Sequence, residues 1–200
     1  MPLPFNDSFP ADGPAGRNWT TVTGTWTVSG GRMTQTTSSS SAAVLLWAEA
    51  AGVADLTVQA NLWRDNTDQK TVGLILRWVN HACYLGLVRT VAAGPDLWQI
   101  FVGNTHDVFT QLGSSTAEEF VDGSLVRFRA QGTSLKLQLW NGSAWIDKVS
   151  VTDSTLTAAG SVGIRTNSNG NPRFDNFNAA VLTPNAPTVP SPLFSLLEEA

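Results

Sequence analysis

The sequence is poor in charged residues and has no long apolar run. Charged residues make up 14% of its 200 positions, and the formal net charge is -4. The twelve Lys and Arg are scattered, so we expect no nucleic-acid partner. No segment approaches the roughly 20 apolar residues of a membrane helix. The opening residues MPLPFND lack the basic and apolar regions of a signal peptide. We therefore expect a soluble product made in the cytoplasm, with no membrane partner.

Cysteine and histidine are almost absent. The single cysteine, Cys83, cannot form an internal disulfide. It lies in an apolar run, where a thiol usually behaves as a small hydrophobic side chain. His81 and His106 are the only histidines, and neither lies near a G-x-S-x-G motif or a cysteine partner. We therefore expect a buried thiol, and neither a serine-hydrolase triad nor a zinc site.

Short alternating segments separated by turn residues dominate what remains. Residues 53–64 alternate apolar and polar side chains, which is typical of a half-buried strand. Gly30-Gly31 separates strand-like residues 25–29 and 32–36, and residues 79–81 separate 71–78 and 82–89, so both pairs read as hairpins. About a dozen such strands predict an all-β fold, a two-sheet antiparallel sandwich or jelly roll. Residues 114–120 are the one modest helix candidate, with Ser115 at the N-cap position and Glu118 and Glu119 in the first turn. A loop is the alternative, because the segment is short.

The two ends of the chain carry a family resemblance. An opening F-x-D-x-F from Phe5, then A-D-G-x-x-G-x-x-W and G-x-W-x-V-x-x-G-R, and a closing F-D-N-F from Phe174 are present. This pattern resembles concanavalin A-like (lectin/glucanase, laminin-G-like) jelly rolls, as in minor tail and other virion surface proteins of phages that infect actinobacteria. The likeness covers roughly residues 5–182. A closing strand beside the opening one would lock a sandwich built from both chain ends, so we expect a single domain over 1–182, followed by a tail over 183–200.

The resemblance also indicates which residue patterns a catalytic site and a calcium site would have in this fold. Glucanases of this class carry a tight run of Glu, Asp and Glu on one strand, and none of the five glutamates here has that spacing. A catalytic pair of Asp55 with Asp65 or Asp68 is left as an alternative to a non-enzymatic protein. Jelly-roll carbohydrate-binding modules often hold calcium where the first and last strands meet. Asp7 and Asp175 match that place, with the alternative that both only cap turns or pair with arginines.

Eight tryptophans are the most suggestive feature for binding, because sugar rings stack on exposed indoles. Trp19 and Trp26 belong to the opening motif, and we expect them inside. Trp63 lies on the polar face of its strand, and Trp98 alternates with Gln99 in a strand whose faces are both mixed. A concave sugar-binding patch is predicted from Trp63, Arg77, Tyr84, Trp98, Arg127 and Arg129. The alternative is that these side chains belong to the core and to interfaces.

The last residues differ from the rest in composition. Four prolines between Pro184 and Pro192 indicate a semi-rigid, extended linker. The end of the chain carries apolar side chains that are costly to leave in water, Leu193, Phe194, Leu196 and Leu197. They predict a segment that docks on a neighbouring subunit, or one that folds back on its own sandwich.

Together these features predict a non-enzymatic virion surface protein of a tailed phage, a capsid decoration or minor tail protein. Its expected partners are other virion proteins, copies of itself in a homo-oligomer, and host-surface glycans bound weakly by many copies. The expected location is the virion surface, and structural calcium is the only cofactor considered. A free-standing lectin-like module is the main alternative, and a divergent glycoside hydrolase is a third.

Overall fold

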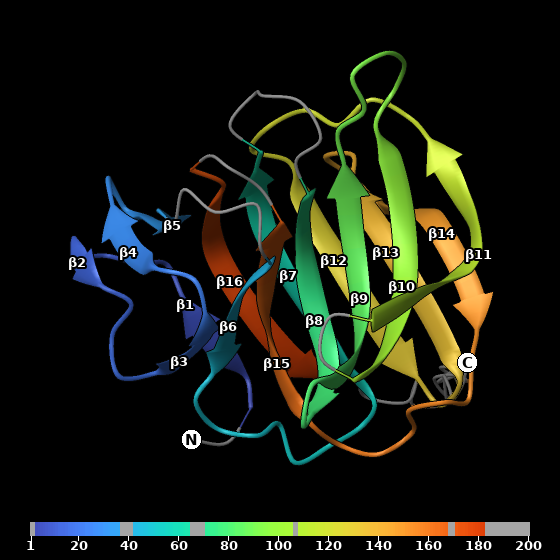
Figure 1. Ribbon diagram of the computed structural model, residues 1–200, viewed down its shortest axis with the longest axis horizontal. Coiled ribbons are helices and arrows are strands. Elements are labelled where there is room, and N and C mark those ends of the chain that lie inside the picture. Colours follow the sequence, from blue (N-terminus) through green and yellow to red (C-terminus); the bar gives the residue numbers. More distant parts are fainter. Residues whose placement is uncertain (1–2, 37–41, 65–70, 106–107, 168–170, 183–200) are drawn as a thin grey trace, which may run out of the picture.

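The computed structural model describes residues 3–36, 42–64, 71–105, 108–167 and 171–182. Every regular element in these ranges is a β-strand, and the strands form two antiparallel sheets that pack face to face (Figure 1). The two-sheet sandwich expected from the sequence is confirmed. No helix of the length and hydrophobicity needed for a membrane crossing occurs among these residues.

The nine-stranded sheet, sheet A, has the order β14 (Trp145–Thr152), β13 (Ser134–Trp140), β12 (Leu125–Gln131), β7 (Leu56–Trp63), β16 (Arg173–Val181), β5 (Arg32–Gln35), β4 (Trp26–Ser29) and β2 (Gly13–Pro14), with β1 (Phe5–Asp7) paired to β16. The seven-stranded sheet, sheet B, has the order β11 (Val108–Ala117), β10 (Leu97–Thr105), β9 (Ala82–Arg89), β8 (Thr71–Val79), β15 (Ser161–Asn167), β6 (Ala42–Trp47) and β3 (Trp19–Thr23).

The helix expected over residues 114–120 is wrong. Residues 114–117 are the last part of β11 and pair with the start of β10, where Leu97 lies opposite Ala117 and Trp98 opposite Thr116. Pairing along a sheet edge satisfies the backbone of this segment, and it outweighs a helix signal that rested on one capping serine and two glutamates.

Both hairpins expected from turn residues are present. Gly30 and Gly31, between β4 and β5, have φ of 58° and 69°, and Asn80 and His81, between β8 and β9, have φ of 48° and 72°. Two successive positive φ angles match the twist of the flanking strands. Glycine adopts them without strain, and asparagine and histidine tolerate them better than most residues.

The opening and closing strands lie side by side, as expected. β1 runs antiparallel to β16, and a cluster of aromatic rings packs behind them. Phe5 stacks on Trp47 with ring centroids 4.9 Å apart, and Trp19 meets Phe177 edge-on at 4.8 Å. Trp19 and Trp26 are buried, as expected. Both ends of the described chain are therefore fixed by one aromatic cluster.

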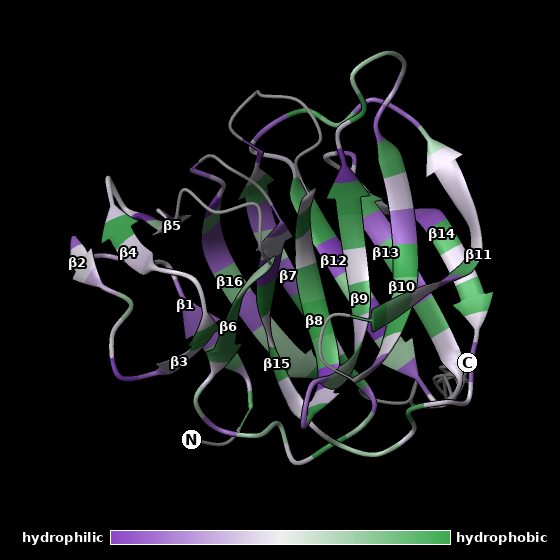
Figure 2. Ribbon diagram, in the orientation of Figure 1, coloured by the Kyte–Doolittle hydropathy of each residue, from purple (hydrophilic) through white to green (hydrophobic). Residues whose placement is uncertain are grey.

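The core lies between the sheets, and the alternation expected for residues 53–64 is confirmed. Leu56, Val58, Ala60 and Leu62 of β7 are fully buried, and the residues between them are half-buried. Figure 2 shows the same alternation of hydrophobic and hydrophilic residues along β16. β8 is different, because it is hydrophobic along most of its length (Figure 2) and occupies the middle of sheet B.

The outer face of sheet B carries a second apolar cluster. Its buried members are Val44, Leu46, Ile75, Cys83, Leu85 and Leu87. Cys83 is fully buried, so the expectation of a buried thiol is confirmed. The outer face of an antiparallel sandwich is commonly solvated, so burial here requires a cover. Phe101 and Phe109 of the β10–β11 hairpin pack against the cluster and provide part of it.

Candidate functional site

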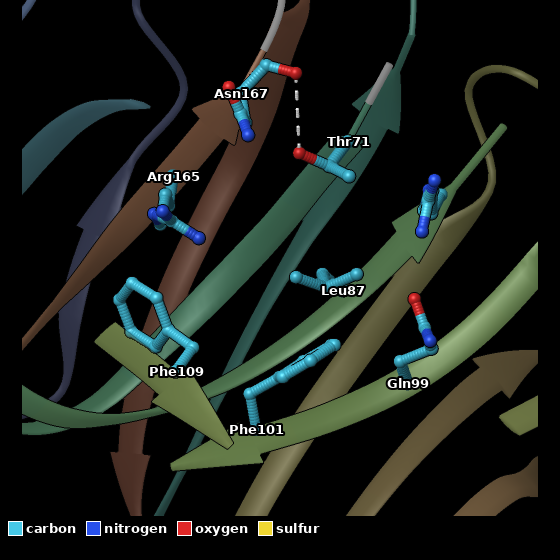
Figure 3. A pocket seen from close by; sticks show the side chains of 8 residues that line it. Thr71, Leu87, Gln99, Phe101, Phe109, Arg165 and Asn167 are labelled. Atoms are coloured by element: carbon cyan, nitrogen blue, oxygen red, sulfur yellow. Dashed lines mark hydrogen bonds between the residues drawn. The ribbon is translucent and has the colours of Figure 1, made fainter. Parts of the chain in front are cut away.

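A hollow of about 400 Å³ opens on the outer face of sheet B (Figure 3). Strands β8, β9, β10, β11 and β15 all contribute to it. Its lining consists of two arginines, three uncharged polar residues and three apolar residues: Arg89, Arg165, Thr71, Gln99, Asn167, Leu87, Phe101 and Phe109. Apolar walls with a few polar groups are typical of sites that bind small ligands.

Strand register explains why the floor of the hollow is low at its centre. Arg165 of β15 lies opposite Gly73 of β8, and Gly73 lies opposite Leu87 of β9. Directly paired residues point to the same face of a sheet. Gly73 has no side chain, so a gap separates Arg165 from Leu87. A Cβ atom at Gly73 would lie 2.7 Å from Leu87 Cβ and 2.6 Å from the Gly86 carbonyl oxygen, so the glycine is required here.

A second row of polar residues continues the floor. Asn167 lies opposite Thr71, and Thr71 lies opposite Arg89 on the other side. The Thr71 hydroxyl donates to the Asn167 carbonyl oxygen at 3.5 Å, the dashed line in Figure 3. This row therefore presents a hydroxyl, an amide and a guanidinium group towards one side of the hollow.

Phe109 forms the roof. The Arg165 guanidinium carbon lies 4.3 Å from the centroid of the Phe109 ring (Figure 3), although β11 and β15 are four strand intervals apart. On a flat sheet that separation would be roughly 19 Å. The hairpin must therefore curl over the outer face of sheet B. Gly103, opposite Phe109, allows this, because a Cβ atom there would lie 2.4 Å from the ring.

A side-chain hydrogen-bond network holds one wall. Gln99 Nε2 donates to Gln111 Oε1 at 2.8 Å and to Ser115 Oγ at 3.0 Å. Gln111 Nε2 in turn donates to the Gly113 carbonyl oxygen at 3.0 Å. These bonds fix the amide of Gln99 with its nitrogen towards β11. Its oxygen is buried and has no hydrogen-bond donor among the described residues.

The hollow is electropositive. Arg89 and Arg165 line it, and none of the other described lining residues is Asp or Glu. Cys83 lies beneath in the outer apolar cluster. Burial raises the pKa of its thiol to about 12, and the charge of Arg165 opposes this only in part. The thiol therefore stays protonated near neutral pH and supplies no negative charge or nucleophile.

The predicted sugar-binding patch is not one surface. Arg77, Tyr84 and Trp98 are 1%, 0% and 0% exposed, so their prediction as exposed sugar contacts is wrong. A bulge after Leu76 shifts the register of β8, and Arg77 adopts φ of 55°, which turns its side chain to the inside. Trp98 alternates with Gln99 in β10 and takes the core side.

Each of these three side chains has structural partners inside the sandwich. Arg77 donates to the backbone carbonyl oxygens of Ala54, Gly132 and Leu156. The Tyr84 hydroxyl donates to Asp153 Oδ1 at 2.5 Å and accepts from the Leu156 amide at 2.9 Å. Trp98 Nε1 donates to the Glu118 carbonyl oxygen at 3.0 Å. Their polar atoms are therefore used within the fold.

The other three predicted residues lie on the outer face of sheet A, on the opposite side from the hollow. Trp63 is half-buried, and the Arg32 guanidinium carbon lies 4.1 Å from its ring centroid. Arg127 covers Trp145 in the same way at 4.1 Å, and its Nε donates to Gln138 at 2.8 Å. Arg129 donates to Gln131.

The residues predicted to hold calcium already bond to the protein. Asp7 Oδ1 accepts from the Phe9 amide, and Oδ2 accepts from Trp19 Nε1, each at 2.8 Å. Asp175 Oδ1 accepts from the Asn176 amide at 2.7 Å. These are the turn-capping roles given as the alternative. No group of three or more His, Cys, Asp or Glu side chains suited to a metal ion occurs in the part of the chain described. Calcium therefore stays a prediction.

Of the alternative catalytic pair and the docking tail, only Asp55 lies among the described residues. Asp55 Oδ1 accepts from the Gly132 amide at 2.8 Å and from Arg77 Nη2 at 3.3 Å, so it serves the fold. Its suggested partners, Asp65 and Asp68, lie outside the described residues. The whole predicted tail over 183–200 also lies outside them, including the predicted docking segment of Leu193, Phe194, Leu196 and Leu197.

Sequence reasoning missed every residue that lines the hollow. One signal was present: β8 and β9 carry apolar residues on both faces, as Ile75 and Leu85 beside Leu74 and Val88 show. A strand that is apolar on both faces needs a cover on each. The sequence contained no comparable signal that Phe109 would provide part of that cover.

Comparisons with known proteins establish the fold. No protein-family profile and no curated protein sequence matches this chain. Its structure is similar to the carbohydrate binding module CBM66 from Bacillus subtilis, with a TM-score of 0.67 and 17% identity over 82% of this chain and 95% of that one. It is also similar to the CBM2 module of the evolved Dit of Lactobacillus casei BL23 phage J-1, with a TM-score of 0.65 and 8% identity over 88% and 93%.

A third similar structure is a larger protein. The GH43 protein BlXynB (mutant K247S) from Bacillus licheniformis matches with a TM-score of 0.65 and 13% identity, over 88% of this chain but 39% of that one. The chain thus spans about two fifths of that protein. Two of these three similar structures are carbohydrate-binding modules by name, and the third contains a sandwich of this kind as one part. The chain is therefore a jelly-roll β-sandwich of the kind found in carbohydrate-binding modules.

Proposed function

We propose that this chain is a non-enzymatic carbohydrate-binding module, and that its ligand occupies the hollow on the outer face of sheet B. The observation that carries the proposal is the lining itself, in which two phenylalanine rings stand beside five hydrogen-bonding side chains. A sugar ring has apolar C–H faces and a polar edge of hydroxyl groups, so it needs both kinds of surface. Similarity to a named carbohydrate-binding module supports the proposal.

The roles of the lining residues follow from their chemistry. The rings of Phe101 and Phe109 offer apolar surface to one side of a sugar, while Thr71, Asn167 and Arg89 offer hydrogen bonds to its hydroxyl groups. Because Phe109 is held between Gly103 and Arg165, its ring is placed before a ligand arrives. Preorganisation of this kind lowers the entropy lost on binding.

Glycan-array binding of the full chain, followed by calorimetry on any oligosaccharide retained, tests the proposal. Phe109→Ala should weaken binding roughly tenfold, because a ring that covers about 60 Å² of sugar contributes about 1.5 kcal/mol. Trp140→Ala is the matched control, since Trp140 is 37% exposed and lies at the end of β13 in sheet A, away from the hollow. A glycan held equally by both variants would place the ligand elsewhere.

A second candidate function is the one that the motif resemblance in the sequence implies, and the similarity to a phage module is compatible with it in fold only. Here the chain is a virion surface component of a tailed phage, a capsid decoration or minor tail protein, and many copies bind host glycans through the same hollow. Residues 184–200 would attach it to other virion proteins. The test is co-sedimentation of the full chain and of a chain ending at Thr183 with particles that lack the protein. Binding that requires the tail supports this role, and absence of binding by the full chain contradicts it.

A glycoside hydrolase is the third possibility, and a direct assay separates it from both. A binding module retains a polysaccharide without releasing reducing ends, whereas a hydrolase must release them. We expect no release from the glycans that the array identifies. Release that disappears in Asp55→Asn would instead revive the carboxylate pair predicted as the alternative.

A further inference from the structure

We infer that the hollow on sheet B selects acidic saccharides, that is, sugars that carry a carboxylate or sulfate group as well as free hydroxyl groups. This inference rests on the proposed function and names the ligand class of the same site. Three features of the lining support it: its charge, the geometry of its two arginines, and an acceptor that lacks a donor.

The charge of the lining has one sign. Arg89 and Arg165 both contribute to the hollow, and none of the eight lining residues is acidic. Arg89 is exposed and makes no ion pair with any residue of the described ranges. A guanidinium group presents several N–H donors in one plane, and its preferred partners are carboxylate and sulfate or phosphate oxygens. The lining thus offers positive charge at Arg89 that no acidic residue of the described ranges neutralises.

The two arginines flank the hollow. They stand on β15 and β9, on either side of β8 and two residues apart along the strands, so their backbones are roughly 12 Å apart. Arg165 lies opposite Gly73 and Arg89 lies opposite Thr71, so the open space above Gly73 is beside Arg165 and diagonally across from Arg89. Arg165 is further oriented by the Phe109 ring, 4.3 Å from its guanidinium carbon. An acidic group above Gly73 would therefore lie within a Debye length of both charges.

The ligand must also donate hydrogen bonds. Gln99 Oε1 is buried at the wall of the hollow and has no donor among the described residues, because the Gln99 amide nitrogen is committed to Gln111 and Ser115. In Figure 3 the Gln99 oxygen points away from the strand, towards the Leu87 side of the hollow. A ligand hydroxyl could supply that donor. Inorganic sulfate has none, whereas a sugar acid combines hydroxyl donors with an anionic acceptor.

The experiment is calorimetry of the full chain with matched pairs of saccharides that differ in charge. Suitable pairs are trigalacturonate and its methyl ester, sialyllactose and lactose, and a sulfated and a desulfated heparin tetrasaccharide. We expect the acidic member of at least one pair to bind at least tenfold more tightly than its neutral partner. The carboxylate and sulfate pairs show which anionic group is preferred, and NaCl should weaken the binding.

Two variants and one control assign the effect to the hollow. Arg89→Gln should weaken binding of the acidic sugar about tenfold and reduce its salt dependence. Arg165→Lys keeps the charge but removes the planar fork, so it should weaken the acidic sugar more than the neutral one. Arg17→Gln changes the net charge equally at an exposed position in the loop before β3, and it should leave both unchanged.

The outcomes separate this inference from the proposed function. Neutral and acidic partners bound equally, with both lost in Phe109→Ala, would overturn the acidic preference and leave carbohydrate binding in place. Equal losses in Arg89→Gln and Arg17→Gln would also overturn it, because the charge effect would then be general. Competition by free sulfate as strong as by the sulfated sugar would overturn the need for a saccharide. No binding of any member would overturn both.

Discussion

Arg77 is expected to stabilise the fold from inside the sandwich and not to contact a ligand. Its guanidinium group donates from Nη1 to the Leu156 carbonyl oxygen at 2.6 Å, from Nη2 to that of Gly132 at 2.9 Å and from Nε to that of Ala54 at 3.0 Å. An ion pair to Asp55 at 3.3 Å completes the set. One buried side chain thus joins three separate loops at one end of the sandwich.

The expected cost of removing it follows from these contacts. Hydrogen bonds to a charged group contribute about 1.5–3 kcal/mol each, but the loops lie near solvent and water replaces part of what is lost. The ion pair adds little to this, because the Asp55 side chain is 47% exposed and stays solvated when Arg77 is removed. We therefore expect Arg77→Met to lower the free energy of unfolding by about 3–5 kcal/mol. Methionine keeps the apolar stem, and the backbone at φ of 55° is equally strained for both residues.

Urea denaturation followed by tryptophan fluorescence measures this loss. In a thermal scan the same change should lower Tm by roughly 6–20 °C for a chain of this size. Arg17→Met is the matched control at an exposed position, and it should change stability by about 0.5 kcal/mol or less. If Arg77→Met retained its stability and instead lost glycan binding, the side chain would be a ligand contact, as the sequence suggested, and the buried assignment would be refuted.

Three further changes are expected to alter stability. Tyr84→Phe removes the hydroxyl that bonds to Asp153 and should cost about 1–2 kcal/mol in urea denaturation. Burial raises the pKa values of Cys83 and Tyr84 to about 12. The stability that both neutral groups contribute is therefore complete below pH 9, and the free energy of unfolding should fall as pH rises towards 12. This fall should be smaller in Cys83→Ala, because only the tyrosine then contributes to it. Native Cys83 should resist a thiol reagent until urea unfolds the chain. Gly163→Ala would place Cβ 2.2 Å from the Leu45 carbonyl oxygen and should cost more than about 2 kcal/mol by circular dichroism melting.

The parts of the fold that sequence could predict depend on local chemistry. Gly30-Gly31 requires only its own backbone freedom to make a hairpin, and the alternation of residues 56–62 requires only a sheet with one buried face. The closing strand was expected beside the opening one, and the pairing of β1 with β16 confirms it. Each of these predictions rests on a pattern within a few neighbouring residues.

Arg77 shows why the candidate site could not be predicted in the same way. Val72, Leu74 and Leu76 of β8 point into the core, so simple alternation places Arg77 outside. The bulge after Leu76 adds a residue to one side of the pairing and reverses the face. The residue types around Leu76 do not predict that bulge. The prediction of a sugar contact at Arg77 was therefore wrong because the register of the strand changes, and not because arginine is unsuited to bind a sugar.

The position of the hollow follows from an incomplete cover over an apolar sheet. Strands β8 and β9 bury apolar side chains on both faces, so part of their outer face must be shielded from water. The curled β10–β11 hairpin shields one part through Phe109. Beyond that ring the same strands change to polar residues, with Thr71 and Arg89 at matching positions. A ligand with one apolar face and one polar edge fits that boundary, and a change that straightened the hairpin, such as Gly103→Val, should abolish the site while the core remains intact.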